Sequence, residues 1–203
     1  SLYWRFHVIM NTKQPLRKPN QDYRSREFLY LSEVNTLIEC AESGRKHRVR
    51  NSALVLIIFR HGLRATECSN LKWDAISFDE RSIYINRAKN GVSGTHNLEE
   101  DEIEKLHSLK KNATSPYIFV GENGEKLSEA AIAKIIKRLG VAASLGFPVH
   151  AHQLRHACGY HLARQGKASY LIQSHLGHRN YKNTEIYIHW AGIPRGSINW
   201  SEQ

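Results

Sequence analysis

The chain has 203 residues, 41% of them hydrophobic, which is enough to bury the core of one domain and excludes disorder throughout. Its 29 lysines and arginines against 19 acidic residues give a formal net charge of +10, which favours a polyanionic partner. No apolar run is long enough to cross a bilayer, and the start of the chain lacks a signal-peptide cleavage site. Three cysteines without paired spacing indicate reduced thiols, so we expect a cytoplasmic protein.

Residues 1–27 precede the first expected helix, and from Asn11 to Glu27 they are polar and basic and contain two prolines. This composition predicts a flexible basic arm, which either touches the partner or is a solvated terminus. Because Met10 is the only methionine, the residues before it are either an upstream extension or a remnant of cloning. We therefore expect the folded domain to begin at residue 28.

Two helices are expected next. The first begins at Ser32 as N-cap and ends at Gly44. The second covers residues 49–61, is hydrophobic on most sides and should therefore lie in the core, with Gly62 ending it. In the turn that follows, Thr66 could cap a short helix and leave Arg64 free to project. The alternative is a local ion pair between Arg64 and Glu67.

Residues 76–78, 82–86 and 95–98 alternate between apolar and polar and are joined by turn-forming residues, which predicts a small antiparallel sheet. An acidic run from Glu99 starts a helix that ends near Lys110, which complements the helix dipole and indicates a solvated face. A further amphipathic helix begins after Ser128 and reaches about Leu139. The fold class predicted is mainly α with a small antiparallel β-sheet.

His152 and Arg155 lie one turn apart at the start of a helix whose apolar stripe includes Leu154 and Ala157, so both should face one cleft. Helix N-terminal amides attract phosphate, and an arginine fork fits two phosphate oxygens. The surrounding segment holds several more cations and a single carboxylate, Glu185. This pattern predicts a phosphate-binding site.

Tyr187 follows His178 by nine residues, in a short run, 183–190, whose spacing is compatible with a helix. A phenol has a pKa near 10 and attacks only where cationic and hydrogen-bonding neighbours favour its deprotonation. The nearby arginines and histidines could do that. The alternative for a tyrosine in this position is a core or interface aromatic.

The 12 histidines raise the question of a metal, and zinc is the alternative ligand. His152 and His156 have i, i+4 spacing, but a zincin motif needs Glu where this chain has Gln153. Carboxylates for Mg²⁺ are scarce in the same segment. We predict no metal and no cofactor, and we interpret His156, His161 and His175 as core or supporting residues.

Several motifs together resemble those of the tyrosine recombinases, or phage integrases. They are Gly62-Leu-Arg64 with Glu67, His152-Gln-Leu-Arg155-His156, Leu176-Gly-His178 and Tyr187-Ile-His189. The resemblance implies that Arg64 and Arg155 hold the scissile phosphate, His152 and His178 position it, and Glu67 supports the site. It also implies that Tyr187 attacks and that Lys89, with Arg87 as a competing assignment, protonates the leaving oxygen. The products would be a 3′-phosphotyrosyl link and a 5′ hydroxyl.

The resemblance also bears on organisation and partners. It implies a catalytic domain over residues 28–190 and a tail, 191–203, that exchanges between subunits or packs on its own domain. The partner would be double-stranded DNA with specific sites, bound by a monomer that forms a homotetramer in the synaptic complex. Most relatives carry another domain ahead of this one, so the short arm resembles the fimbrial phase-variation invertases or marks a trimmed protein. A bacterial or phage-derived, nucleoid-associated protein is expected.

Two alternative functions remain open from the sequence. One is a nicking and resealing topoisomerase of the type IB kind, which would use the same active-site residues. The other is a DNA-binding protein of the same fold without chemistry. The presence of Tyr187 with all six polar motif residues argues against the second alternative.

Overall fold

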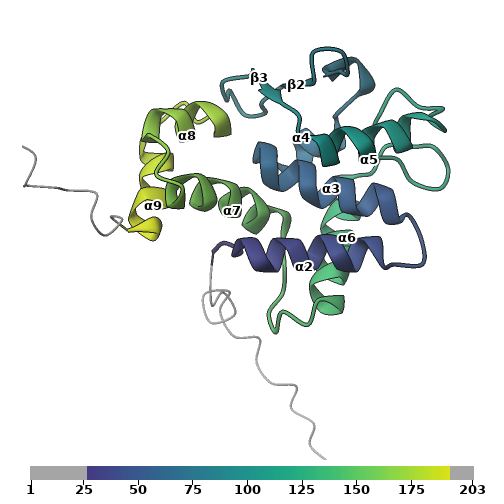
Figure 1. The fold of residues 1–203 in the computed structure, drawn as a ribbon, viewed down its shortest axis with the longest axis horizontal. Coiled ribbons are helices and arrows are strands. Elements are labelled where there is room, and N and C mark those ends of the chain that lie inside the picture. Colours follow the sequence, from purple (N-terminus) through teal and green to yellow (C-terminus); the bar gives the residue numbers. More distant parts are fainter. Residues whose placement is uncertain (1–26, 193–203) are drawn as a thin grey trace, which may run out of the picture.

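Helix α3 (Arg48–His61) lies at the centre of the computed structural model, which describes residues 27–192 (Figure 1). Almost every side chain from Ser52 to His61 is buried, as the sequence predicted. The helix ends at Gly62, whose φ of +57° is easy for glycine. A Cβ atom there would lie 2.3 Å from Leu176 Cδ2, so the turn also needs glycine for space. This turn brings the end of α3 against the C-terminal part of the chain.

Helix α2 (Leu31–Glu42) packs along α3, and its ends differ from the predicted ones. It begins after Tyr30, so Ser32 lies inside the helix and is not the N-cap. The reason is that the carboxylate of Glu33 reaches back and accepts a hydrogen bond from the Tyr30 N–H at 2.7 Å. The helix ends before Ser43, ahead of Gly44.

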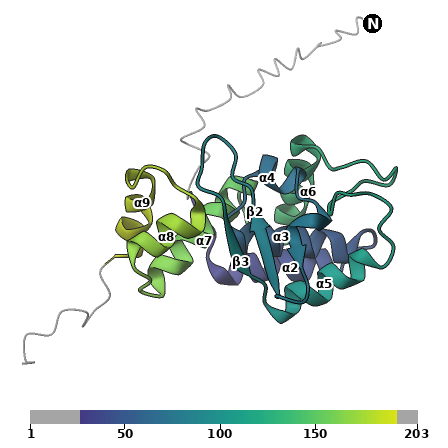
Figure 2. The same ribbon diagram turned by 90° about the horizontal axis from the view of Figure 1, so that it is seen from above.

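The predicted antiparallel sheet is present and has the strand order β1-β2-β3. Strand β1 (Ile76–Ser77) pairs with β2 (Ser82–Ile85), which pairs with β3 (Gly94–Asn97). Ile83 and Ile85 of β2 are buried, so the sheet lies on the helical core, as Figure 2 shows from above. The short helices α4 (Ala65–Ser69) and η1 (Trp73–Ala75) connect α3 to the sheet.

Helix α5 (Glu100–Lys110) follows the sheet, and α6 (Glu129–Ala142) begins after Ser128, whose hydroxyl accepts a hydrogen bond from the Ala131 N–H at 3.1 Å. Helix α7 (Ala151–Arg164) then crosses from α3 to the end of the molecule formed by α8 (Ser169–Leu176) and α9 (Lys182–Ala191), as Figure 1 shows. The predicted helix at 183–190 is therefore confirmed. Within residues 27–192 no helix combines the length and apolar character needed to cross a membrane.

Candidate active site

Glu67 on α4 is a buried carboxylate that accepts hydrogen bonds from two arginines. Its Oε1 accepts from Arg64 Nη1 at 2.6 Å and from the backbone N–H of Ala88 at 3.0 Å. Its Oε2 accepts from the Arg64 N–H at 3.0 Å and from Arg87 Nη1 at 2.9 Å. Burial alone would raise the pKa of Glu67, but these donors and the charge of Arg87 hold that pKa below its ordinary value. Glu67 is therefore ionised at neutral pH and offsets the charge of the arginines around it.

Arg64 is the N-cap residue of α4, so the prediction that Thr66 caps this helix is wrong. The reason is that Glu67, three residues on, satisfies the Arg64 N–H with its side chain. The Arg64 guanidinium bends back to the same carboxylate and still leaves 26% of its side chain exposed. Arg64 is thus paired with Glu67 and at the same time accessible to a ligand.

Arg155 on α7 lies deeper than the helical spacing alone indicates. Its side chain is 2% exposed, and its guanidinium donates to the carbonyls of Gly62 and Leu176, the latter at 2.8 Å. His152, one turn earlier, is exposed. Burial first, and then repulsion from Arg64 and Arg87, lower the pKa of Arg155 to about 10. The side chain therefore keeps its positive charge at neutral pH.

Tyr187 on α9 is 1% exposed and packs against α7 at Gly159. Its hydroxyl lies 3.0 Å from Nδ1 of His156, and its ring lies nearly parallel to that of His178, with 6.0 Å between the ring centroids. Burial raises the pKa of Tyr187 to about 12, although the charges of Arg155 and Arg64 act in the opposite direction. The phenol is protonated at neutral pH and has a histidine ring nitrogen within hydrogen-bonding distance.

His178 is held by a turn that requires a glycine before it. Gly177 has a φ of +65°, and a Cβ atom there would lie 2.6 Å from the carbonyl oxygen of Val92. His178 is 8% exposed, and its Nδ1 lies 2.9 Å from Thr184 Oγ1. Burial first, and then the charge of Arg155, lower the pKa of His178 to about 4. His178 is therefore neutral at physiological pH and can donate one hydrogen bond without carrying charge.

Lys89 lies in the connection between β2 and β3, and its side chain is exposed. It has a φ of +54°, which is uncommon for a residue with a side chain. The N–H of the preceding Ala88 donates to Glu67, so the backbone next to Lys89 is fixed at the edge of the site. From there the flexible lysine stem can extend towards a bound ligand.

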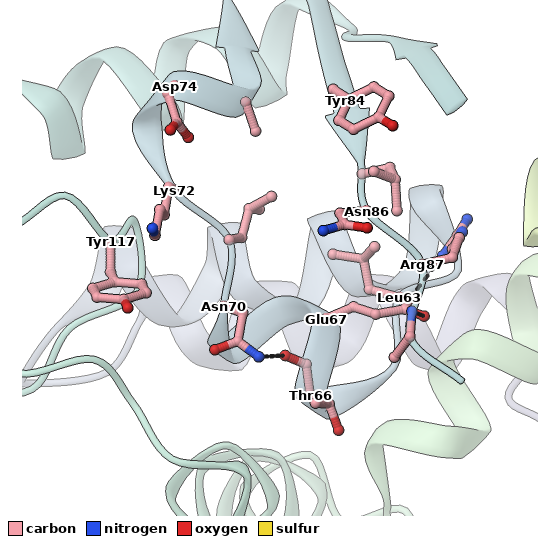
Figure 3. A pocket seen from close by; sticks show the side chains of 14 residues that line it. Leu63, Thr66, Glu67, Asn70, Lys72, Asp74, Tyr84, Asn86, Arg87 and Tyr117 are labelled. Carbon is pink, nitrogen blue, oxygen red and sulfur yellow. Dashed lines mark hydrogen bonds and ion pairs between the residues drawn. The ribbon is translucent and has the colours of Figure 1, made fainter. Parts of the chain in front are cut away.

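A cavity of about 750 Å³ opens beside Glu67, between α4, η1 and β2. Figure 3 shows Glu67 and Arg87 near one end and Lys72 with Tyr117 at the other. The ammonium groups of Lys72 and Lys126 lie 5.4 Å and 5.3 Å from the centre of the Tyr117 ring. Polar and cationic side chains of this kind suit a strand of nucleic acid better than an apolar small molecule.

The part of the chain that the structure describes contains no group of three His, Cys, Asp or Glu side chains arranged to hold a metal ion. The buried His61 makes polar contacts with one carboxylate and one imidazole. Its Nε2 donates to Glu102 at 2.8 Å and its Nδ1 lies 3.1 Å from Nδ1 of His96.

The model of the family described as "Phage integrase family" matches residues 27–192. The chain belongs to the phage integrase family. The fimbriae regulatory protein FimB of Escherichia coli K12 is 38% identical over 176 residues, which cover 84% of this chain and 88% of FimB. A crystal structure of XerA recombinase has a TM-score of 0.71 at 28% identity, over 80% of this chain and 60% of that one. A post-cleavage complex of XerH with its difH substrate, at 23% identity, shares the fold with a TM-score of 0.65 over 81% and 50% of the chains.

In this phage integrase domain the residues expected from the motifs converge from four parts of the chain. Arg64 and Glu67 come from the N-cap and first turn of α4, Arg155 from α7, His178 from the turn after α8, and Tyr187 from α9. His156, predicted to be a core or supporting residue, lies at the Tyr187 hydroxyl, whereas the contacts of Arg87 and Gly159 were not predicted. His156 shares a helix face with His152 at i, i+4, a signal the sequence did contain, whereas the contacts of Gly159 had no local signal.

Proposed function

We propose that this chain is a site-specific DNA recombinase that cuts and rejoins double-stranded DNA through a 3′-phosphotyrosyl intermediate. The observation that carries the proposal is a buried tyrosine, Tyr187, whose hydroxyl lies 3.0 Å from Nδ1 of His156 and whose pKa is raised by burial while the charges of Arg155 and Arg64 act to lower it. Two of the similar proteins, XerA and XerH, are recombinases by their names. The net charge of +10 supports binding to a polyanion.

Cleavage begins with attack by the Tyr187 oxygen on the scissile phosphorus. The phenol proton passes to Nδ1 of His156, which lies within 3.0 Å of the hydroxyl. The bond from phosphorus to the 5′ oxygen breaks, and Lys89 gives that oxygen a proton. The products are a 3′-phosphotyrosyl bond and a 5′ hydroxyl. His156 has gained the proton that the phenol lost, and Lys89 has given up the proton that the 5′ oxygen gained.

Arg64 and Arg155 neutralise the non-bridging oxygens, where negative charge is greatest during the transfer. Each donor of this kind is worth about 3 kcal/mol of transition-state stabilisation. His152, exposed at the start of α7, and His178, neutral and buried, position the same phosphate. Because the phosphodiester energy is kept in the tyrosyl link, attack by another strand's 5′ hydroxyl reseals DNA without ATP.

The test is covalent trapping on a nicked duplex whose sequence comes from a search for inverted or direct repeats around the gene. The unchanged protein should form an adduct, and Tyr187→Phe should bind equally well and form none. Tyr181→Phe, an exposed tyrosine one residue before α9, is the matched control and should form the adduct normally. An adduct that survives Tyr187→Phe would place the nucleophile elsewhere, and no adduct with the unchanged protein would favour a binding protein without chemistry.

A nicking and resealing topoisomerase would also form the adduct, so a second measurement separates the two activities. A recombinase joins strands from two specific sites and should yield recombinant product only when both are present. A topoisomerase would relax supercoiled DNA that contains one site or none. Relaxation at full rate without a paired site would support the topoisomerase.

The protein is a monomer away from DNA and a homotetramer on two sites, with residues 191–203 docking on a neighbouring subunit. Most of this tail lies outside the described residues, and its sequence, with Ile193, Pro194, Ile198 and Trp200, is apolar enough to be buried. We place the protein with the nucleoid in the bacterial cytoplasm, where its substrate lies.

A further inference from the structure

Arg87, at the end of β2, is a buried arginine that no step of the proposed reaction uses. Its residue is 6% exposed. Its Nη1 donates to the Gly62 carbonyl at 3.1 Å and to Glu67 at 2.9 Å. Its Nη2 donates to the carbonyls of His61, at 2.7 Å, and of His175. One guanidinium therefore joins the end of α3, helix α4 and helix α8 to the connection between β2 and β3.

That connection is the segment that carries Lys89, and Arg87 belongs to a set of contacts that hold it on both sides. Before Lys89, the Ala88 N–H donates to Glu67 at 3.0 Å. After Lys89, the Val92 N–H donates to the Gly177 carbonyl at 3.2 Å. The Arg87 N–H is itself bonded to Ser93 Oγ at 3.0 Å, across the base of the loop. The loop is thus fixed at its two ends while the Lys89 side chain remains exposed.

Two glycines show how closely Arg87 is enclosed. A Cβ atom on Gly177 would lie 2.7 Å from Arg87 Cγ, and one on Gly91 would lie 2.8 Å from Arg87 Cβ. Both distances are shorter than real Cβ contacts, so neither position has room for a side chain. Arg87 therefore occupies one fixed path between the loop and the turn that presents His178.

Arginine suits this position for a reason that lysine does not share. Four acceptors lie around one planar group, and a guanidinium has several donors in a fixed fork, whereas an ammonium is a point charge on a flexible stem. A lysine at position 87 would keep the positive charge beside Glu67 but could not bridge α4 to both His61 and His175. The loop would lose the bonds through which the Arg87 guanidinium joins it to the His61 and His175 carbonyls, while the charge of the site stayed the same.

We propose that Arg87 is a positioning residue that holds the β2–β3 connection so that Lys89 reaches the 5′ oxygen of the scissile phosphate. The inference rests on the proposed function, in which Lys89 is the general acid. Arg87 does not touch the reacting atoms. Its effect passes through the fixed backbone on either side of Lys89.

The test compares two substrates in single-turnover cleavage, one with the ordinary bridging 5′ oxygen and one with sulfur there. A thiolate leaves without a proton, so sulfur removes the need for Lys89. Arg87→Lys should slow cleavage of the oxygen substrate by about 100-fold, which is the low end for general acid catalysis. On the sulfur substrate, the cleavage rate of Arg87→Lys should return to within a few-fold of the rate of the unchanged protein. Lys89→Ala should behave the same way. Arg64→Lys, which alters a contact to the non-bridging oxygens, should not be rescued.

A purely structural role for Arg87 would give a different result, because misfolding lowers cleavage of both substrates equally. Equal loss on oxygen and sulfur, or no loss on either, would overturn the inference. If Arg87→Lys does not fold, Gly91→Ala is the variant that tests the positioning role. It leaves every hydrogen-bond donor of Arg87 in place, but its Cβ atom pushes the loop away from Arg87. The same sulfur rescue is expected for Gly91→Ala, and its absence overturns the inference.

The two proposals fail in distinguishable ways. If Lys89→Ala is rescued by sulfur and the Arg87 and Gly91 variants are not, Lys89 remains the acid and only the positioning role falls. If Lys89→Ala is not rescued, the acid is another group, and both the Lys89 step and the inference built on it are refuted. The assignment of Tyr187 as the nucleophile would stand in either case, because it is tested separately by Tyr187→Phe.

Discussion

Gly159→Ala should slow DNA cleavage because it displaces the proposed nucleophile. A Cβ atom on Gly159 would lie 2.7 Å from three ring atoms of Tyr187, where ordinary carbon contacts are about 3.5–4.0 Å. The ring must therefore retreat by roughly 1 Å, away from His156. Overpacking lowers the free energy of unfolding by about 1–3 kcal/mol, and the higher helix propensity of alanine offsets about 1 kcal/mol of that loss. We expect a loss of stability of about 0–2 kcal/mol.

The effect on chemistry should be larger than the effect on stability. A misplacement of about 1 Å can cost about 100-fold in rate. The assay is single-turnover formation of the covalent adduct on a nicked duplex, run at a temperature where urea unfolding shows the variant to be folded. The expected rate is roughly 100-fold below that of the unchanged protein, with unchanged DNA affinity.

Gly140→Ala is the matched control. Its Cβ atom would lie 2.4 Å from Val149 Cγ2, so it overpacks helix α6 as severely, in a part of the molecule away from α9 (Figure 1). It should lose stability and keep the cleavage rate of its folded fraction. If Gly159→Ala cleaves as fast as Gly140→Ala, the packing of α7 against Tyr187 does not set the position of the nucleophile.

Three further results are expected. Burial, and then His175 and His61, lower the pKa of His96 to about 2, so folded His96 stays neutral while the unfolded chain binds a proton below about pH 6.5. The free energy of unfolding should therefore decrease as the pH is lowered below about 6.5, by up to roughly 1.4 kcal/mol per pH unit from this group. In urea titrations, His96→Asn should remove that part of the pH dependence. Adduct formation should persist in excess EDTA, because side chains supply the cations; loss that added Mg²⁺ or Zn²⁺ restores would contradict this. Deleting residues 192–203 should spare binding to one site and abolish recombination, whereas full recombination by the shortened protein would exclude the tail as the assembly element.

Local features of the sequence were enough to predict the elements and the motif residues. The apolar residues of α3 surround the helix, and Gly62 follows them, so a core helix with a defined end could be predicted. The alternation and turns between residues 76 and 98 likewise predicted the sheet. The two wrongly predicted helix starts have one cause: the carboxylates of Glu33 and Glu67 accept hydrogen bonds from backbone N–H groups three residues earlier, which moves the N-cap to that earlier residue.

The arrangement of the site was decided by packing between elements far apart in the chain. The depth of Arg155 depends on how α7 lies on α3, since its acceptors are carbonyls 93 and 21 residues away. The contact of His156 with Tyr187 depends on α9 docking over Gly159. Helical periodicity states which side chains share a face, but it does not state which helix that face meets or how closely. Sequence spacing by itself therefore determined which residues could act. Only the tertiary structure decided that Glu67 is the shared acceptor of Arg64 and Arg87, because the four donors to Glu67 come from two segments that meet only in the folded chain.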